Sequence, residues 1–349
     1  MKKKKVLEML AEVVLEQKGN GQWGTAHVYR STSNSFSSFL SLYKLGVDIS
    51  FPQLTPALLK SYESHLREKG CSWNTVATYM KVLKAVYNRA VDQSLATFVP
   101  RLFKHVRTTP CNERKRALDT DEMHRILQTE ENDLNRFHHL QETSIVADKE
   151  PAAEHSEEAD RAIPDSVGFQ MNPSTARQYF ILMFLLRGIP FVDIAYLKQG
   201  DIRRGVLYYR RRKTGKPLCV ALTKEAEALI ERLRNRNAHP SDYLFPFLRS
   251  PEGSEKAYRE YQSALRCFNR HLKELPRQVG GCFSPLSSYA ARHTWATMAY
   301  HCEVHPGIIS EAMGHSSIAI TEIYLKPFQN EKIDLANRQV IDYVKHFSC

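Results

Sequence analysis

The chain has 349 residues, which is enough for two domains that each bury a hydrophobic core. Its 42% hydrophobic and 25% charged residues are ordinary for a soluble protein, and no apolar run approaches the ~20 residues of a membrane span. Acidic residues interrupt the segment after the basic N-terminus, which argues against a secretion signal. Seven cysteines without a CxxC pair favour reduced thiols, so we expect a cytoplasmic protein without membrane association.

The net charge of +11 is distributed unevenly. Residues 1–116 carry 19 Lys and Arg against 8 Asp and Glu, and residues 166–349 carry 26 against 16. Between them, residues 119–165 hold 14 acidic and 4 basic residues. Two basic bodies separated by an acidic stretch favour a polyanionic partner. Nucleic acid is the first candidate, because counterion release drives its binding.

Helical periodicity dominates the first hundred residues. We expect an N-terminal helix or arm over residues 1–21, and a bundle of about four helices over residues 22–105. The most regular helix begins with a cap at Asn74 and has an apolar stripe, which consists of Val76, Met80, Leu83, Val86 and Ala90. Basic residues on the outer faces are either solvated or contact phosphates. The DNA-binding candidates among them are Arg30, Lys81, Lys84 and Arg89.

Residues 106–116 contain Pro110 and a cluster of basic residues, which is typical of an interdomain linker. Arg114, Lys115 and Arg116 are further DNA-binding candidates. A second domain is expected over residues 117–349. Its acidic segment, about 141–170, has little apolar periodicity and is expected to be a loosely ordered insertion. That insertion is either a solvated loop or a flap that competes with DNA for a basic groove.

The helix predicted from Ser174 to Arg187 is apolar on nearly all sides, which indicates burial all round. Gly188 is expected to end it. A guanidinium beside so apolar a helix is costly unless an anion meets it. That anion is either Asp193 or a bound phosphate.

After this helix the pattern changes to strands. Residues 205–212 and 216–222 are two β-rich runs that flank a turn containing Lys213. A lysine in a turn is usually solvated. A hairpin tip can also carry an ammonium group onto a bound ligand.

A helix is predicted from Ser287, as its cap, through Ala299. Tyr289, Arg292 and His293 stand at i, i+3 and i+4, so they share one face of it. Three polar groups therefore converge beside an apolar run. Taken singly, each residue is also compatible with an ordinary amphipathic helix.

Pro306 is placed to begin the next helix, and Gly314 to end it in a left-handed cap that exposes His315. Tyr324 follows in a short segment of mixed polarity.

The polar residues at these positions form a series: Arg187 in LLRGIPFVDIAYL, Lys213 in YYRRRKTGKPL, Arg292 in YAARHTWAT, His315 in MGHSS and Tyr324 in TEIYLK. The series resembles the tyrosine recombinase, or phage integrase, family, whose pattern is Arg, Lys, His-x-x-Arg, His or Trp, and Tyr. It is especially similar to the branch of conjugative and other mobile elements, which implies a bacterial protein. The resemblance implies a mainly α fold with a small β-sheet, divided into a SAM-like core-binding domain at residues 22–105 and a mixed α/β catalytic domain.

The resemblance also implies an activity, site-specific cleavage and rejoining of DNA for integration, excision or inversion. Tyr324 would attack a phosphodiester to give a 3′-phosphotyrosine, without metal, ATP or another cofactor. Arg187 and Arg292 would clamp the phosphate, and Lys213 would protonate the leaving 5′-oxygen. His315 would form a hydrogen bond with the phosphate.

One position departs from the family pattern, because Tyr289 stands where a histidine is usual. A neutral phenol is a poor base near pH 7. Either Tyr289 only hydrogen-bonds the phosphate, or His293, His315 or water accepts the proton from Tyr324.

The segment from residue 330 to 347 has a helical apolar period. In the family, a helix here packs into a neighbouring protomer and links four active sites. The chain is therefore expected to be a monomer in solution and a homotetramer on synapsed double-stranded DNA. The alternative is a cap on its own domain.

Three other functions compete with this interpretation. A catalytically silent DNA-binding protein is supported by Tyr289 alone. A metal hydrolase using His293, His301, Cys302, His305 and His315 lacks an HExxH or CxxC motif, so no metal site is predicted. A type IB topoisomerase shares the chemistry, but the resemblance and the C-terminal helix favour recombination.

Overall fold

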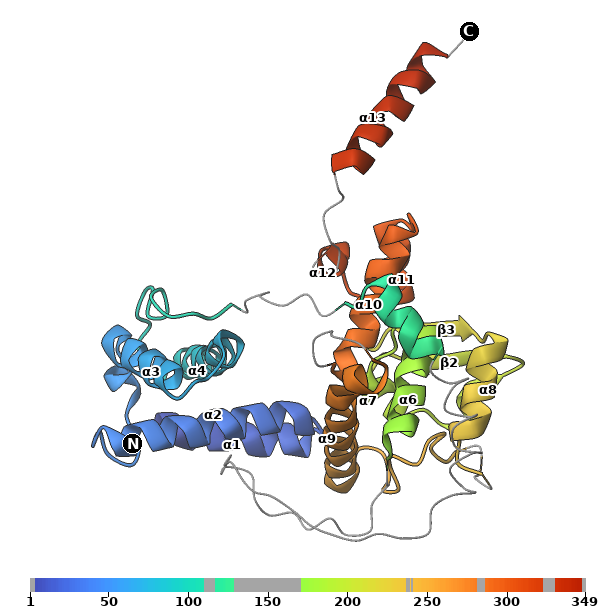
Figure 1. Cartoon of the computed structure of the whole chain (residues 1–349). Coiled ribbons are helices and arrows are strands. Elements are labelled where there is room, and N and C mark those ends of the chain that lie inside the picture. The colour runs from blue at the N-terminus through green and yellow to red at the C-terminus, as the bar shows by residue number, and fades with distance from the viewer. Residues whose placement is uncertain are drawn as a thin grey trace. The chain divides into compact units, whose positions relative to one another are not determined.

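The computed structural model describes residues 4–109, 117–128, 171–236, 239, 241–280, 286–322 and 330–346 (Figure 1). The chain divides into two compact units. Unit 1 contains residues 1–114 and 250–259, and unit 2 contains residues 115–249 and 260–349.

Unit 1 is helical. Its elements are α1 (Val6–Gly19), α2 (Trp23–Leu42), the 3-10 turn η1 (Phe51–Gln53), α3 (Pro56–Glu68) and α4 (Trp73–Asp92). The apolar face of α1 is buried, and α1 packs along α2. Leu10, Phe36 and Leu59 are fully buried in the shared core, because each helix turns one apolar stripe inward.

Helix α4 confirms the predicted stripe, since Val76, Met80, Leu83, Val86 and Ala90 are all buried. The cap predicted at Asn74 is wrong. Ser72 is the N-cap, and its hydroxyl accepts a hydrogen bond from the Thr75 backbone N–H. Both residues are good caps, so composition alone did not distinguish them.

Unit 2 begins with a helix over residues 120–128, which Asp119 caps: its carboxylate accepts from the Glu122 N–H, and the Glu122 carboxylate accepts from the Asp119 N–H. Next come α6 (Pro173–Leu185), α7 (Phe191–Ala195) and the 3-10 turn η2 (Gln199–Asp201). A sheet of β1 (Ile202–Arg203), β2 (Val206–Arg210) and β3 (Pro217–Ala221) follows. The remaining elements are α8 (Lys224–Leu233), α9 (Glu255–Gln278), α10 (Ser288–His301), α11 (Pro306–Ala312), α12 (Ile318–Glu322) and α13 (Asn330–Lys345). The first five residues of α9 belong to unit 1.

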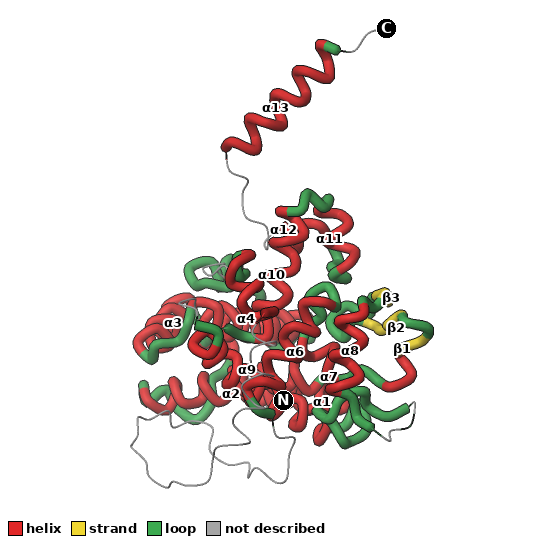
Figure 2. Tube along the Cα trace, turned by 45° about the vertical axis from the view of Figure 1, so that its right-hand side comes forward, coloured by secondary structure: helices red, strands yellow, loops and turns green. Residues whose placement is uncertain are grey.

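The sheet is antiparallel in the order β1-β2-β3, and Tyr208 pairs with Cys219 in its register. Figure 2 shows how small it is beside the helices. The mainly helical fold class with a small sheet is therefore confirmed.

Helix α6 forms the centre of unit 2. Tyr179, Phe180 and Leu182 are buried on different sides of it, as its continuous apolar sequence predicted. It packs against α10, and buried Thr294 of α10 accepts a hydrogen bond from the Leu118 N–H at 3.0 Å. These contacts fix α10 in the domain interior, so a polar residue on its inner face is held rigidly.

Among the described residues, no helix is both long enough and apolar enough to cross a membrane.

Candidate active site

Arg292 is a fully buried arginine in the middle of α10, only 2% exposed. Its NH1 donates to the Gly188 carbonyl at 2.9 Å, and its NH2 donates to the Met313 carbonyl at 2.7 Å. NH2 also lies 2.8 Å from His315 Nε2. A guanidinium is always charged and can only donate, so these acceptors offset the cost of its burial. One side chain therefore ties together three segments that are distant in sequence.

The bond from Arg292 fixes the state of His315. Because the arginine donates, Nε2 must be the unprotonated acceptor, and the proton sits on Nδ1, 2.8 Å from the Thr321 hydroxyl oxygen. Burial, and then nearby positive charge, lowers the pKa of His315 to about 4. The charges belong to Arg292, Arg211, Lys213 and Lys216. His315 is thus a neutral imidazole at pH 7.

Gly188 allows the closest approach in this site. A Cβ on it would lie 2.8 Å from the Arg292 Cα, and its φ is +67°. Glycine therefore satisfies two requirements here, space and a left-handed conformation. The predicted end of the helix at Arg187, with Gly188 as its cap, is wrong: α6 ends at Leu185, Leu186 is the C-cap, and both Arg187 and Gly188 have positive φ. The contact of Gly188 with Arg292 places the Arg187 segment directly against α10.

Arg187 also has a positive φ, 59°, and its NH1 donates to the Cys219 carbonyl of β3 at 3.2 Å. The suggestion that Asp193 is its counterion is wrong. Asp193 instead forms a buried ion pair with Arg211 NH1, and its other oxygen accepts from the Arg212 N–H at 2.9 Å. Sequence proximity favoured Arg187, but the hairpin brings Arg211 into contact from 18 residues away.

Arg211 is the site residue that the sequence analysis missed. It is 6% exposed, and its Nε is buried without a hydrogen-bond partner in the described structure. Its charge lowers the pKa of His315 more than that of Lys213 does. The strand pattern carried a signal. Alternation puts Leu207, Tyr209 and Arg211 on one inward face, while Tyr208 and Arg210 are exposed.

The pKa of Tyr209 shows which charged groups lie around its ring. Burial raises the pKa of its phenol, and Asp193 raises it further. The groups that act in the opposite direction are Arg211, Arg292 and Arg187, in that order. Three guanidinium groups and one carboxylate therefore face a single ring, which gives this region a strongly positive potential.

The tip of the β2–β3 hairpin lies on the turn that carries His315. Thr214 donates from its hydroxyl to the Gly314 carbonyl at 3.3 Å. A Cβ on Gly314 would come within 2.8 Å of Arg211 Cγ and 3.0 Å of Leu218 Cδ1, so only glycine fits beneath the hairpin. Lys213 is exposed in this tip, at the predicted turn. Its charge lowers the pKa of His315.

Tyr289 and His293 lie one turn apart on α10 with ring centroids 5.5 Å apart. Tyr289 is 42% exposed, and His293 is half-buried. Ser287 is the N-cap of α10 as predicted, but its side chain makes no capping hydrogen bond. Tyr324 lies outside the described residues.

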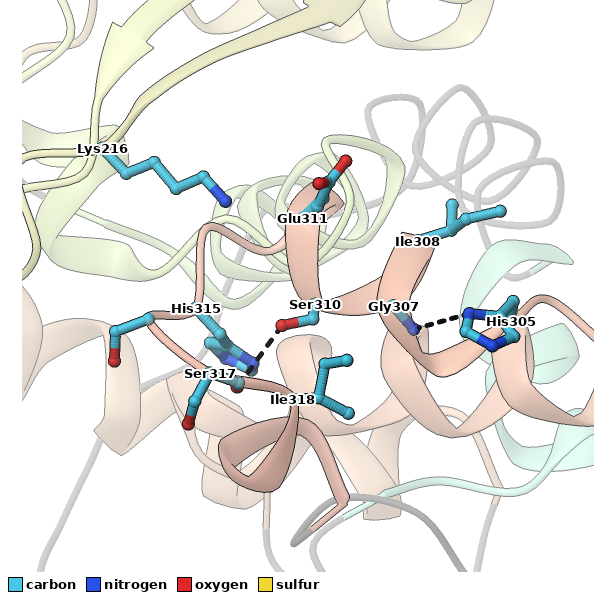
Figure 3. A pocket seen from close by; sticks show the side chains of 10 residues that line it. Lys216, His305, Gly307, Ile308, Ser310, Glu311, His315, Ser317 and Ile318 are labelled. Carbon is cyan, nitrogen blue, oxygen red and sulfur yellow. Dashed lines mark hydrogen bonds between the residues drawn. The ribbon is translucent and has the colours of Figure 1, made fainter.

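A shallow pocket of 410 Å³ opens beside His315, and Figure 3 shows its lining. Ser310 on α11 donates to the Ser317 carbonyl at 3.4 Å, and His305 accepts from the Gly307 N–H at 3.1 Å. Lys216 extends into the view from the hairpin. The pocket thus extends from His315 along α11, with Lys216 and Glu311 both in its lining.

Two family models match the sequence. The Phage integrase SAM-like domain matches residues 5–102, and the Phage integrase family matches residues 161–331. The chain belongs to the phage integrase family of tyrosine recombinases.

A tyrosine recombinase of Pseudothermotoga lettingae is 24% identical to this recombinase over 213 residues, 58% of this chain and 70% of the relative. The Tn1549 transposon integrase, solved with transposon right end DNA, has the same fold with a TM-score of 0.59 at 13% identity. The match covers 97% of this chain and 100% of that one. The lambda integrase tetramer bound to a Holliday junction matches with a TM-score of 0.54 at 14% identity, over 90% of this chain and 77% of that one.

The DNA-binding candidates of unit 1 occupy different environments. Arg30 on α2 and Lys81 and Lys84 on α4 are exposed. Arg89 forms an ion pair with Glu16 of α1 at 2.6 Å, which offsets part of its charge. Arg114, Lys115 and Arg116 lie outside the described residues.

The histidines of the metal-hydrolase alternative do not converge. Both ring nitrogens of His315 are engaged, and His305 Nδ1 accepts from a backbone N–H. Among the described residues, no group of three or more His, Cys, Asp or Glu side chains is arranged to hold a metal ion.

We expect Gly188→Ala to destabilise unit 2 by about 2–4 kcal/mol, since the new Cβ both strains the backbone and collides with Arg292. Gly215→Ala is the matched control, because Gly215 has φ +70° but nothing within 4 Å, and it should cost only ~1 kcal/mol. Urea unfolding followed by the fluorescence of Trp295, with Trp23 and Trp73 replaced by Phe, measures both. Equal losses would show that the contact with Arg292 is unimportant.

Proposed function

We propose that this recombinase is catalytically active and cleaves and rejoins DNA at specific sites through a 3′-phosphotyrosine intermediate. The observation that carries the proposal is the buried Arg292, bonded to a neutral His315 and flanked by Arg211. Such a preorganised cluster of donors in a dry site fits a phosphate whose charge grows in the transition state. We propose that it serves the integration, excision or inversion of a mobile element, a role that is consistent with its family.

In the proposed reaction, the Tyr324 phenol oxygen attacks phosphorus, and the bond from phosphorus to the 5′-oxygen breaks. The phenol proton leaves to a base, and Lys213 donates a proton to the departing 5′-oxygen. The 3′-phosphotyrosine keeps the energy of the phosphodiester, so a 5′-hydroxyl can reverse the step on a new strand. The same residues then act with their acid and base roles exchanged.

Arg292 and Arg211 are proposed to hold the non-bridging oxygens. Both face His315 from buried positions, and a guanidinium fork suits two phosphate oxygens. Arg187, whose NH1 contacts the Cys219 carbonyl, would close the cluster from the β3 side. The clamp predicted from sequence, Arg187 with Arg292, thereby gains a third member.

His315 is proposed to contact the phosphate only after a change of partner. Its Nε2 accepts from Arg292 in the described structure, so it has no proton there to donate. A bound phosphate would attract Arg292 and raise the pKa of His315, because a nearby negative charge favours the cation. The pKa of about 4 makes His315 a weak base before DNA binds, and the phosphate would make it a stronger one. The proposed base is therefore His293, His315 in its DNA-bound state, or water, with Tyr289 as a hydrogen-bond donor to DNA.

Double-stranded DNA is the proposed partner, bound by a homotetramer that assembles on it from free monomers. Helix α13 supports this assembly. Five of its large apolar side chains are exposed, and they are Leu335, Val340, Ile341, Tyr343 and Val344. An apolar helix face left uncovered by its own domain favours packing on a neighbouring protomer over an intramolecular cap. The fold shared with the lambda integrase tetramer is compatible with it.

A catalytically silent DNA-binding protein is the second candidate, and the observation that favours it is Tyr289 at the usual histidine position.

Covalent capture separates the two candidates. Incubation with a nicked duplex that carries the joined ends of the encoding element should give a protein–DNA adduct that resists denaturation. Tyr324→Phe should abolish it, since no other residue is proposed to attack phosphorus. Tyr289→Phe should retain it at a reduced rate. Absence of an adduct from the unmodified chain, on DNA that it binds, would establish the silent alternative.

The roles of the arginines are tested by charge-conserving changes. Arg211→Lys should lower the single-turnover cleavage rate by about 100-fold, because lysine keeps the ion pair with Asp193 but loses the planar fork. Arg187→Lys should lower it less than about tenfold. Thermal unfolding of each variant controls for stability. The reverse order of effects would make Arg187 the principal clamp.

A further inference from the structure

The indole of Trp73, the first residue of α4, holds two arginines at once. The guanidinium carbon of Arg67 lies 4.4 Å from the ring centroid, and that of Arg107 lies 5.0 Å from it. Arg67 comes from α3, and Arg107 comes from the segment that follows the helices of unit 1. Two like charges are therefore gathered on one aromatic ring.

Hydrogen bonds fix both arginines in place, and Arg67 is exposed whereas Arg107 is half-buried. The Arg107 N–H donates to the Glu63 carboxylate at 2.8 Å, and Glu63, only 4% exposed, is also paired with Lys60. Arg67 NH1 donates to the Cys71 carbonyl. The buried Glu63 carboxylate therefore positions Arg107 through its backbone N–H and does not pair with its guanidinium.

Among the described residues, no anion accompanies the cluster. Within the part of the chain that the structure describes, neither guanidinium has a carboxylate at ion-pair distance, and the Trp73 indole N–H makes no hydrogen bond. A cation–π contact at an exposed site is weak, so it does not by itself favour two cations side by side. An anion between or beside them would offset their repulsion.

We infer that the Arg67–Trp73–Arg107 cluster binds backbone phosphates of duplex DNA. The inference rests on the proposed function, because it takes DNA as the partner. Two guanidinium forks and an indole N–H are all donors, which is the complement of phosphate oxygens. Such phosphate contacts do not depend on the base sequence. They would add to any contacts that DNA makes with Arg30 on α2 and with Lys81 and Lys84 on α4. Arg107 also lies at the start of the expected linker, so a phosphate here would position the chain where it leaves unit 1.

Salt dependence of DNA binding tests this cluster in the full chain with Tyr324→Phe, which prevents covalent trapping. The probe is a fluorescein-labelled 30-bp duplex of mixed sequence, measured by polarisation from about 50 to 300 mM KCl. Arg67→Gln and Arg107→Gln should each weaken binding roughly tenfold and reduce the slope of log K against log salt by about 0.9. Trp73→Phe keeps the ring but loses the N–H, so it should weaken binding without changing the slope.

Lys44→Asn is the matched control. Lys44 is exposed, has a φ of 54° that asparagine tolerates, and its removal also costs one positive charge. It should leave the slope unchanged, and the melting temperatures of all variants should agree with that of the parent.

Three outcomes would overturn the inference. Equal loss in Lys44→Asn would mean that only total charge matters. Unchanged binding in both arginine variants would remove the cluster from the interface. Unchanged DNA binding with impaired chain–chain association in sedimentation would make it a protein contact. If the parent chain itself bound no duplex, the proposed function would fail before this question arose.

Discussion

The hydrogen bonds of Arg292 are the interaction on which the rest of unit 2 depends. A guanidinium that is 2% exposed is stable only if its donors meet acceptors, and here those acceptors come from the end of α6, the end of α11 and the imidazole that follows it. The packing that satisfies one buried charge is therefore also the packing that assembles the candidate site. Loss of Arg292 or of one of its acceptors would leave a buried polar group without a hydrogen bond.

Two glycines and one carboxylate make this arrangement possible. Gly188 and Gly314 lie where a Cβ would collide with Arg292 or Arg211, so the arginines approach the backbone more closely than any other residue there would permit. Asp193 neutralises Arg211 and also accepts from the Arg212 N–H, which holds the hairpin at both residues. The exposed Lys213 is thus carried on a turn whose base is rigid, an arrangement that suits delivery of a proton to a bound ligand.

The sequence predicted the elements that have a strong period and the site residues that lie in a motif. The stripe of α4 and the all-round burial of α6 follow directly from residue spacing. A helix face indicates Arg292 and a glycine cap indicates His315 as site residues, and the structure brings the two into contact. Arg211 lies in a run of three arginines, and no motif distinguishes it from its neighbours. Strand alternation assigns it to the inner face, but its partner Asp193 and its contact with Gly314 depend on tertiary packing.

The same limit explains the cluster on Trp73. Arg67 and Arg107 are 40 residues apart, and nothing in their local sequence relates them. A cation–π contact becomes visible only when α3 and the segment after α4 are placed on one side of the bundle.

The most direct test of the central claim is the protonation state of His315 in the free chain. Selective labelling with [15N]histidine, with His315→Gln to assign its signals among the 14 histidines, reports the tautomer and the pKa by NMR. The account predicts a neutral ring with its proton on Nδ1 from pH 7.5 down to about 5.5, and a pKa of about 4. A proton on Nε2, or a titration near the ordinary pKa of ~6.5, would contradict it, because Arg292 could then not donate to that nitrogen.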